Sequence, residues 1–225
     1  MEPKTTLIED AYQKIKDMIF EQKLMPGQKL VYGDLSESFR MSQTPVINAL
    51  FRLEHEGFVV SAPFRGFSVK KMDLQEAWDL FGVREALEAY LVEQVVLRAL
   101  PSDLEQLEQR LAEHAAYQPK SYDRQRFKLD SEFHLELAAL SGNRMLIQQL
   151  RTCFEHFYVR FRFEAMDLSR LQLAVDEHRQ ILDRISRKDI PGARDAIRMH
   201  VQHGRDYVIR CLDDESSSRA RRDRN

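Results

Sequence analysis

The sequence predicts a mainly α-helical protein with two domains: a small one of three helices and a β-hairpin, then a larger one made only of helices. Apolar residues recur at helical spacing through most of the 225-residue chain. A strand pattern occurs once, in residues 58–69, where two short apolar segments flank a turn with proline and glycine. From Asp73 onward the sequence has no convincing strand pattern. The joint between the domains is therefore expected near residues 69–73.

Turn and cap residues separate the elements of the first domain, residues 1–72. Pro26 and Gly27 mark the turn after the first helix. Ser42 is a candidate N-cap for the third helix, and Gly57 is a candidate C′ residue at its end. Three helices followed by a β-ribbon are typical of a winged helix-turn-helix. The predicted elements are helices over residues 7–22, 32–39 and 43–56, and a hairpin of residues 58–60 with 67–69.

The second domain, residues 73–213, is predicted to be an all-α bundle of about six helices. Asp73 is a candidate cap of the first helix, and Ser102 with Glu105 has the spacing of a capping box. Residues 214–225 are polar and rich in arginine, so we expect a disordered tail. The helices are expected from Asp73 to about Ala99, from Pro101 onward, and over approximately Tyr122–Leu140, Asn143–Met166, Leu171–Arg187 and Pro191–Leu212.

Composition limits the class of protein. Hydrophobic residues make up 43% of the chain, which is typical of a globular protein, and the net charge of −2 gives no overall basic character. Residues 1–72 hold ten Lys or Arg and nine Asp or Glu, a net charge of only +1. Two cysteines are too few for a disulfide framework, and the sequence has neither a signal-peptide pattern nor an apolar run long enough for a membrane span. We therefore expect a cytoplasmic protein with no membrane association.

The motifs of residues 8–70 resemble the N-terminal domain of GntR-type bacterial transcription regulators. They include PGxxL from Pro26, DLS from Asp34, SxTPVxxAL from Ser42, RLExEG from Arg52 and RGFxV from Arg65. The resemblance implies that the helix after Ser42 enters the major groove of an operator DNA duplex. It is specific as a set of motifs, although no single motif would be.

Six residues are candidate DNA contacts. The hydroxyls of Ser42 and Thr44 can bind phosphate beside the helix N-terminus. Gln43 and Asn48 can each form two hydrogen bonds with adenine. Arg52 lies further along the helix, and Arg65 at the tip of the wing can reach the backbone or the minor groove.

The chain departs from the family at three positions. Members of the family typically carry arginine at the positions of Gln43 and Ile47, and many carry it at the position of Gly33. Each guanine-reading arginine contributes roughly 1–3 kcal/mol of discrimination. We therefore expect an operator that is poorer in guanine contacts and leans toward A·T pairs. A winged helix that has lost DNA binding and serves as an interaction module is the alternative interpretation.

Histidines and one aspartate form a second pattern in the helical domain. Asp130 and His134 are four residues apart, so they share a helix face that also carries apolar residues. His178 and His200 also fall on apolar helix faces. A histidine in such a place is, taken alone, more often a packed core residue than a metal ligand. A cation would explain why a carboxylate and imidazoles share a buried face.

Residues 73–212 resemble the FCD effector domain, which is the all-α C-terminal half found in one GntR branch. The resemblance lies in the Asp130-x3-His134…His178…His200 spacing, in Val83-Arg84-x-x-Leu87-Glu88, and in Ser141-Gly142-Asn143. It implies a divalent transition metal, with zinc or nickel suiting three histidines and one carboxylate. It also implies that a small organic acid completes the coordination shell. Arg84 and Asn143 are candidate effector contacts, while an ion pair of Arg84 with Glu85 or Glu88, and a capping role for Asn143, stay open.

The resemblance implies a homodimeric transcriptional regulator, without enzymatic activity, that responds to a small carboxylate. Repression relieved by the ligand is the simplest mode, because blocking a promoter requires only occupancy. Two other functions stay open. A metal sensor would respond to the ion alone, and a metal-dependent hydrolase would use the ion to activate water.

Overall fold

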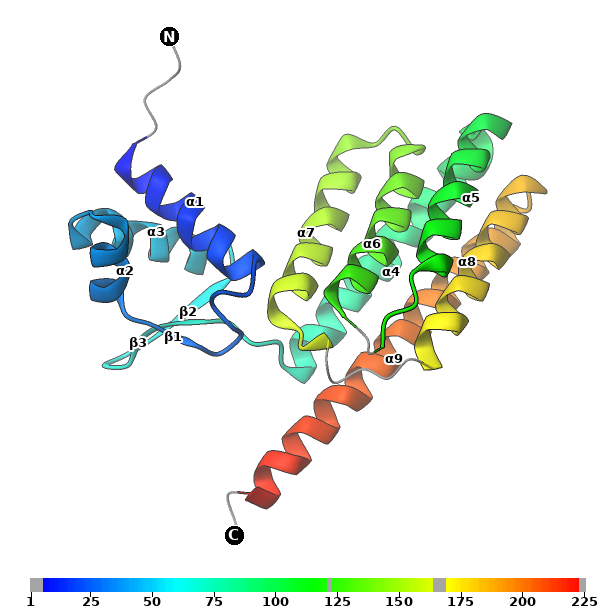
Figure 1. The fold of residues 1–225 in the computed structure, drawn as a ribbon. Helices are drawn as coiled ribbons and strands as arrows, with labels where there is room; N and C mark the ends of the chain where they lie inside the picture. Colours follow the sequence, from blue (N-terminus) through cyan, green and yellow to red (C-terminus); the bar gives the residue numbers. More distant parts are fainter. Residues whose placement is uncertain (1–5, 121–122, 164–168, 223–225) are drawn as a thin grey trace. The chain divides into compact units, whose positions relative to one another are not determined.

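The computed structural model describes residues 6–120, 123–163 and 169–222 (Figure 1). These residues form two compact units. The first combines the chain up to Met72 with His156–Arg162, and the second combines Asp73–Glu155 with the chain from Phe163 onward. The last turn of the seventh helix thus clusters with the N-terminal unit, a grouping that the sequence did not predict. Tyr122 and Met166, where two predicted helices were expected to begin and end, lie outside the described residues.

The N-terminal unit contains three helices, α1 (Leu7–Phe20), α2 (Tyr32–Phe39) and α3 (Gln43–His55). Helix α3 begins after Ser42, as predicted, and ends in a Schellman motif. Gly57 supplies the left-handed residue with φ of +80°, and the N–H of Phe58 donates to the carbonyl of Leu53 at 2.9 Å. The apolar faces of the three helices meet in one buried core, whose members include Ala11, Ile15, Ile19, Leu35, Val46, Ala49, Leu50 and Leu53.

The sheet of this unit has three antiparallel strands in the order β1-β3-β2. Strands β2 (Val59–Ala62) and β3 (Gly66–Val69) form the predicted hairpin, with Val59 opposite Val69 and Ala62 opposite Gly66. Strand β1 (Lys29–Leu30) was not predicted. It has only two residues and exists because it pairs with β3, which a local pattern cannot reveal.

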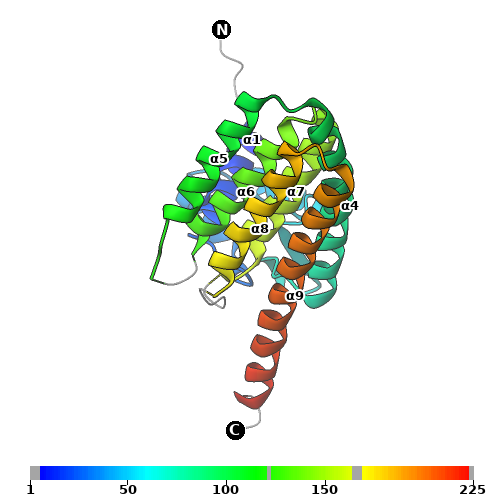
Figure 2. The same ribbon diagram turned by 90° about the vertical axis from the view of Figure 1, so that its right-hand side faces the viewer.

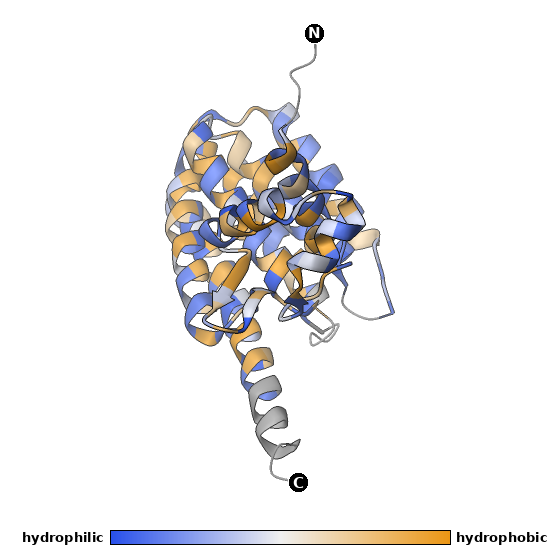
Figure 3. Cartoon of the chain, turned by 90° about the vertical axis from the view of Figure 1, so that its left-hand side faces the viewer, coloured by the Kyte–Doolittle hydropathy of each residue, from blue (hydrophilic) through white to orange (hydrophobic). Residues whose placement is uncertain are grey.

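The second unit is a bundle of helices. Helix α9 packs along α4 and α8, and α5 packs against α6 and α8 (Figure 2). Figure 3 shows apolar and polar residues alternating around these helices, as expected where one face of each is buried. None of the described helices is long and apolar enough to cross a membrane. The helices are α4 (Leu74–Arg98), α5 (Pro101–Ala116), α6 (Arg124–Ala139), α7 (Arg144–Arg160), α8 (Ser169–Ser186) and α9 (Ile190–Arg222).

The predicted fold class is confirmed, with three local differences besides strand β1. Because Pro101 is the first residue of α5, the cap falls on Leu100, and the N–H of Leu100 donates to the Asp103 carboxylate at 2.8 Å. The predicted capping box of Ser102 and Glu105 was therefore wrong. Helix α7 ends at Arg160, before the predicted end. Helix α9 continues to Arg222, where a disordered tail was expected, because residues 205–222 contain no proline or glycine to end it.

Candidate metal centre and nucleic-acid interface

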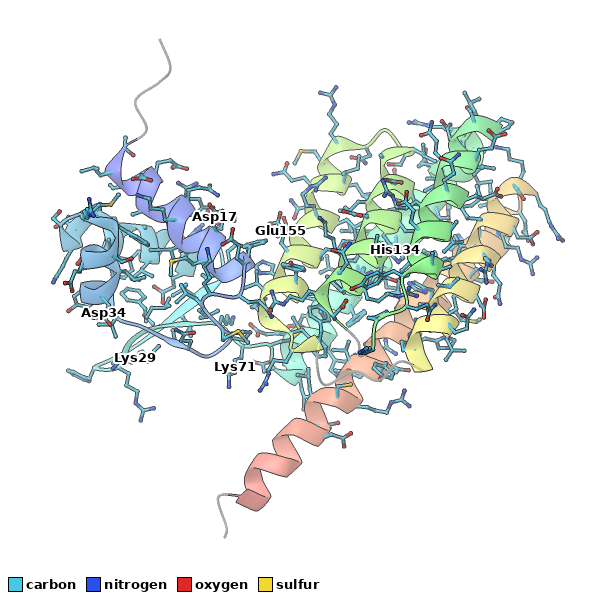
Figure 4. The ribbon with its side chains drawn as sticks, viewed as in Figure 1. Asp17, Lys29, Asp34, Lys71, His134 and Glu155 are labelled. Atoms are coloured by element: carbon cyan, nitrogen blue, oxygen red, sulfur yellow. The ribbon has the colours of Figure 1, made fainter. Side chains whose placement is uncertain are left out.

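The metal-ligand set predicted from the sequence comes together in the second unit. Asp130 and His134 lie one turn apart on α6, while His178 is on α8 and His200 on α9. One ligand atom from each of the four lies within 4.8 Å of the others. The three imidazoles are buried, and Figure 4 places the labelled His134 on α6 inside its helical unit.

The spacing of the imidazole nitrogens fits a shared ion. The Nε2–Nε2 distances are 3.0 Å between His134 and His200, 3.2 Å between His134 and His178, and 3.3 Å between His178 and His200. Nitrogens bound about 2.0–2.1 Å from one ion lie roughly 2.9 Å apart at right angles and roughly 3.4 Å apart at tetrahedral angles. The observed distances fall within this range. The oxygens of Asp130 lie 3.6 Å from His178 Nε2 and 3.9 Å from His134 Nε2.

Two carboxylates orient the histidines from behind. Glu88, on α4, places an oxygen 2.5 Å from Nδ1 of His134, and Glu177, on α8, places one 2.7 Å from Nδ1 of His200. A carboxylate at Nδ1 favours a proton there and leaves the lone pair of the ring on Nε2. The lone pairs of His134 and His200 therefore face each other at 3.0 Å. A metal ion bound to both nitrogens would satisfy the two lone pairs.

The electrostatics of the centre favour ionised carboxylates and a neutral His200. Burial opposes the ionisation of Glu88, but the charges of Arg84 and His134 outweigh it and hold the pKa of Glu88 at about 2. Nearby histidines likewise hold the pKa of Asp130 well below its usual value against the effect of burial. Burial lowers the pKa of His200 to about 4. An ionised Asp130 and a neutral His200 are the forms in which these two side chains bind a metal.

Arg84 contacts the centre from α4. Its Nη2 lies 2.8 Å from Nε2 of His134, and its Nε donates to Glu88. Glu85, the other partner considered for Arg84, pairs with Arg198 instead. The ion pair with Glu88 is therefore present, and the same guanidinium also faces the candidate ligands.

Asn143 is not brought to the centre. Its side chain is exposed at the start of α7, where Oδ1 accepts from the N–H of Leu146 at 3.1 Å. The structure thus gives Asn143 the capping role that the sequence left open.

Sequence reasoning missed three residues around the centre. Glu177 has no local signal, because His200 lies 23 residues away on another helix. Glu88 was considered only as a partner of Arg84, although a carboxylate on the buried face of α4 signals a second partner. His114, which the sequence did not single out, is buried on α5 with its ring 5.5 Å from that of His178.

The predicted DNA-contact residues lie together on the surface of the N-terminal unit. Ser42, Gln43, Thr44 and Asn48 are all exposed. Ser42 precedes the first turn of α3 without capping it through its side chain, and Thr44 and Asn48 are one turn apart on the same face. The N-terminal end of α3 therefore presents uncharged hydrogen-bonding groups.

Arg52 is exposed but already paired with carboxylates of its own unit. Its guanidinium pairs with Glu9 at 2.6 Å and with Glu56 at 3.2 Å, and it lies 3.6 Å over the ring of Tyr12. Two other arginines are more available. Arg65 is exposed in the turn between β2 and β3, and Arg40 is exposed in the turn before α3 and pairs with no carboxylate of the described residues. Arg40 was not singled out from the sequence, although an arginine in a helix-turn-helix turn is a reasonable signal.

Both units match known protein families. Residues 7–69 match the family described as bacterial regulatory proteins of the gntR family, and residues 79–203 match the FCD domain. An HTH-type transcriptional regulator of Bacillus subtilis, YdhC, is 26% identical over 90% of this chain and 91% of its own length. The Nta operon transcriptional regulator of Aminobacter aminovorans is 27% identical over 83% of this chain and 87% of its own length. The HTH-type transcriptional repressor RspR of Escherichia coli is 24% identical over 90% of this chain and 89% of its own length.

Solved structures share the fold. A transcriptional regulator from Rhodococcus sp. RHA1 superposes with a TM-score of 0.70 at 17% identity, covering 90% of this chain and 97% of that one. McbR/YncC of E. coli superposes with a TM-score of 0.67 at 21% identity, covering 91% of this chain and 98% of that one. At these identities the likeness concerns the fold alone.

Proposed function

Since the chain belongs to the GntR family of bacterial transcriptional regulators and carries an FCD domain, we propose that it is a repressor controlled by a small carboxylate. The carboxylate binds at a divalent transition metal in the helical unit, and its binding changes the affinity of the winged helix for operator DNA. The observation that carries this proposal is the convergence of three buried Nε2 atoms at 3.0–3.3 Å beside Asp130.

Asp130, His134, His178 and His200 are the proposed metal ligands. Three imidazoles and one carboxylate suit a first-row ion such as zinc or nickel. Bound there, the metal supplies a positive charge and coordination positions for an exogenous ligand. The carboxylates of Glu88 and Glu177 keep two of the imidazole rings in the orientation and tautomer that binding needs.

Charge balance supports an anionic effector. Arg84 and Glu88 offset each other, which leaves Asp130 as the negative ligand of the buried set. A divalent ion would therefore leave about one excess positive charge in a site with little access to water, and a carboxylate would neutralise it. The guanidinium of Arg84 lies 2.8 Å from Nε2 of His134. A metal bound to that nitrogen would replace this contact, and the proposal is that Arg84 then donates to the carboxylate of the effector.

The N-terminal unit supplies the proposed DNA contacts. Ser42 and Thr44 bind phosphate at the N-terminus of α3, and Gln43 and Asn48 read adenine in the major groove. Arg65 adds a contact from the wing. Without an arginine at Gln43 or Ile47, the operator is expected to lean toward A·T pairs. A homodimer would place two such units on the half-sites of a pseudopalindrome.

Repression is the proposed mode, since occupancy of a promoter is enough to block it. The effector acts by binding one arrangement of the dimer more tightly than another and thereby shifting their populations. The relative RspR of Escherichia coli, which is described as a repressor, supports this mode.

The test is a titration of metal and acid against DNA affinity. A duplex is first selected by the wild-type protein from a random-sequence library. Its affinity is then measured by fluorescence anisotropy with chelator-treated protein, with protein reloaded with Zn²⁺ or Ni²⁺, and with reloaded protein plus acetate, lactate, succinate or citrate. We expect the affinity to fall at least fivefold only when both metal and one of the acids are present.

The other outcomes separate the alternatives. A change with metal alone would indicate a metal sensor. Turnover of an ester substrate by the metal-loaded protein would indicate a hydrolase. If wild-type protein selects no duplex, the winged helix is an interaction module and the repressor proposal fails.

A further inference from the structure

The turn between β2 and β3 carries a phenylalanine that the fold does not use. The side chain of Phe64 has a relative exposure of 108%, the highest of the exposed large hydrophobic residues that the structure describes. Its φ of +62° lies in the left-handed region, which bulky residues rarely adopt. The hairpin turn stands away from the helices of its own unit in Figure 1. Neither packing nor backbone preference explains a phenylalanine at this position.

The hairpin that carries Phe64 is stiff and is attached to α3. The carboxylate of Glu54, on α3, accepts hydrogen bonds from the N–H of Ser61 at 2.9 Å and from its hydroxyl at 2.5 Å. The ring of Phe51, also on α3, contacts that of Phe67 on β3 edge to face, with centroids 5.2 Å apart. The position of the turn is therefore determined by the helix that is proposed to read the operator.

The charge around the turn suits a polyanion. Residues 60–66 are all exposed, and they include Arg65 but no carboxylate. When α3 occupies a major groove, an element fixed beside it meets the phosphate backbone and the minor groove next to it. Minor-groove proteins commonly combine an arginine with an apolar side chain. The arginine binds in the groove, and the apolar side chain inserts between two stacked bases.

We propose that Phe64 is an apolar wedge that enters the minor groove beside the site read by α3 and partly unstacks one base step there. The inference rests on the proposed DNA-binding function and adds a residue that determines specificity. Pyrimidine–purine steps, TA above all, are the easiest to unstack, so Phe64 selects such a step through its deformability rather than through hydrogen bonds. This preference agrees with the A·T-leaning operator expected from α3.

The test uses full-length protein and the duplex selected by the wild type. Adenines flanking the α3 site are replaced one at a time by 2-aminopurine, whose fluorescence rises when the base is unstacked. With wild-type protein we expect a rise at one flanking step. Phe64→Ala should abolish that rise and weaken binding about tenfold, and Phe64→Leu should restore part of both.

Arg65→Ala is the matched control from the same turn. It removes a charge and should lower the slope of log affinity against log salt by about 1, while the 2-aminopurine signal remains. Phe64→Ala should leave that slope unchanged. Circular dichroism melting checks that each variant is folded, which is expected for substitutions at an exposed turn.

Several results would overturn the proposal. Wild-type fluorescence and affinity in Phe64→Ala would show that the ring does not enter the stack. A change in oligomeric state in Phe64→Ala, measured by sedimentation, would assign Phe64 to a protein interface instead. Failure of the wild type to bind any duplex would overturn the DNA-binding function as well, so the two failures are distinguishable.

Discussion

The two functional regions of the molecule hold their polar groups in opposite ways. On α3, the side chains of Gln43, Thr44 and Asn48 are exposed and can change one at a time with little effect on the fold. In the helical unit, His134 is buried between Arg84 and Glu88, and each group depends on the others. The recognition surface can thus be altered residue by residue, whereas the buried centre changes as a unit.

The largest effect is expected from removing a proposed ligand. His200→Ala, and separately His178→Ala, should weaken zinc or nickel binding at least 100-fold, because three protein ligands then remain. The measurement is metal content by mass spectrometry after chelator treatment, reloading and desalting. His55→Ala, which removes an exposed histidine on α3, is the control and should keep one ion per chain. One bound ion per chain in both His200→Ala and His178→Ala would show that the ligand assignment is wrong.

A smaller effect is expected from the carboxylate behind His134. Glu88→Gln leaves Arg84 buried without its ionic partner, so the free energy of unfolding of the metal-free protein should fall by about 3 kcal/mol. Metal affinity should fall about 10–100-fold, because the His134 ring loses its carboxylate. Urea denaturation and calorimetric titration measure the two effects. Glu85→Gln on the same helix, whose partner Arg198 is half exposed, should cost less than about 1 kcal/mol. Equal losses in both variants would remove the distinction between buried and exposed pairs.

Acid should weaken the buried centre before it affects the recognition surface. Burial lowers the pKa of both His114 and His200 to about 4, below the value of about 6.5 in an unfolded chain. Between these values the unfolded chain binds protons that the folded chain does not, so the metal-free protein loses stability as the pH falls from about 6.5 to 4. The loss is at most about 3 kcal/mol for each histidine. The pKa of Glu88 is about 2 in the folded chain, so the stability that its ionised form contributes is lost only as the pH falls below about 4.5.

Urea denaturation in EDTA at pH 7.5, 6.0 and 5.0 measures this dependence. The same series with excess zinc should give a higher free energy of unfolding but a similar loss from pH 7.5 to 6.0, because His200 is already neutral in the folded chain at these pH values. A free energy of unfolding that stays constant from pH 7.5 to 5.0 would contradict the burial of neutral histidines.

The smallest effects are expected from replacing arginines of the N-terminal unit, and their kind should differ between Arg52 and the other two. Arg40→Ala and Arg65→Ala should each lower the salt slope of DNA binding by about 1, because each removes one phosphate contact. Arg52→Ala should leave the slope nearly unchanged and instead destabilise the unit by about 0.5–1 kcal/mol, since Arg52 already pairs with Glu9 and Glu56 at a half-exposed site. Salt-dependent anisotropy and thermal melting measure the two quantities. The reverse pattern would mean that Arg52 leaves its carboxylates for DNA.

The sequence predicted those parts of the fold whose causes are local. Asp73 caps α4 and Gly57 ends α3 because a cap or a left-handed residue acts within a few positions. Strand β1 escaped prediction because its two residues become a strand only opposite β3. The cap of α5 was predicted at Ser102 but lies at Leu100, because Pro101 is the first residue of the helix.

The candidate site shows the same limit. The four proposed ligands could be named because family resemblance fixed their spacing, but the groups that orient them could not. Glu177 reaches His200 across two helices, and Glu9 reaches Arg52 over 43 positions. Such pairs are created by tertiary packing, so the residues that tune a site are harder to read from sequence than the residues that form it.

The contacts of Glu177 connect the interior of the bundle to the solvent. One of its oxygens holds the buried His200 and the other lies 2.8 Å from Nδ1 of His203, which is exposed. The orientation of a buried imidazole is thereby supported by a side chain that water reaches. Substitutions at position 203 offer evolution a way to adjust the strength of the centre from outside, without repacking the core around it.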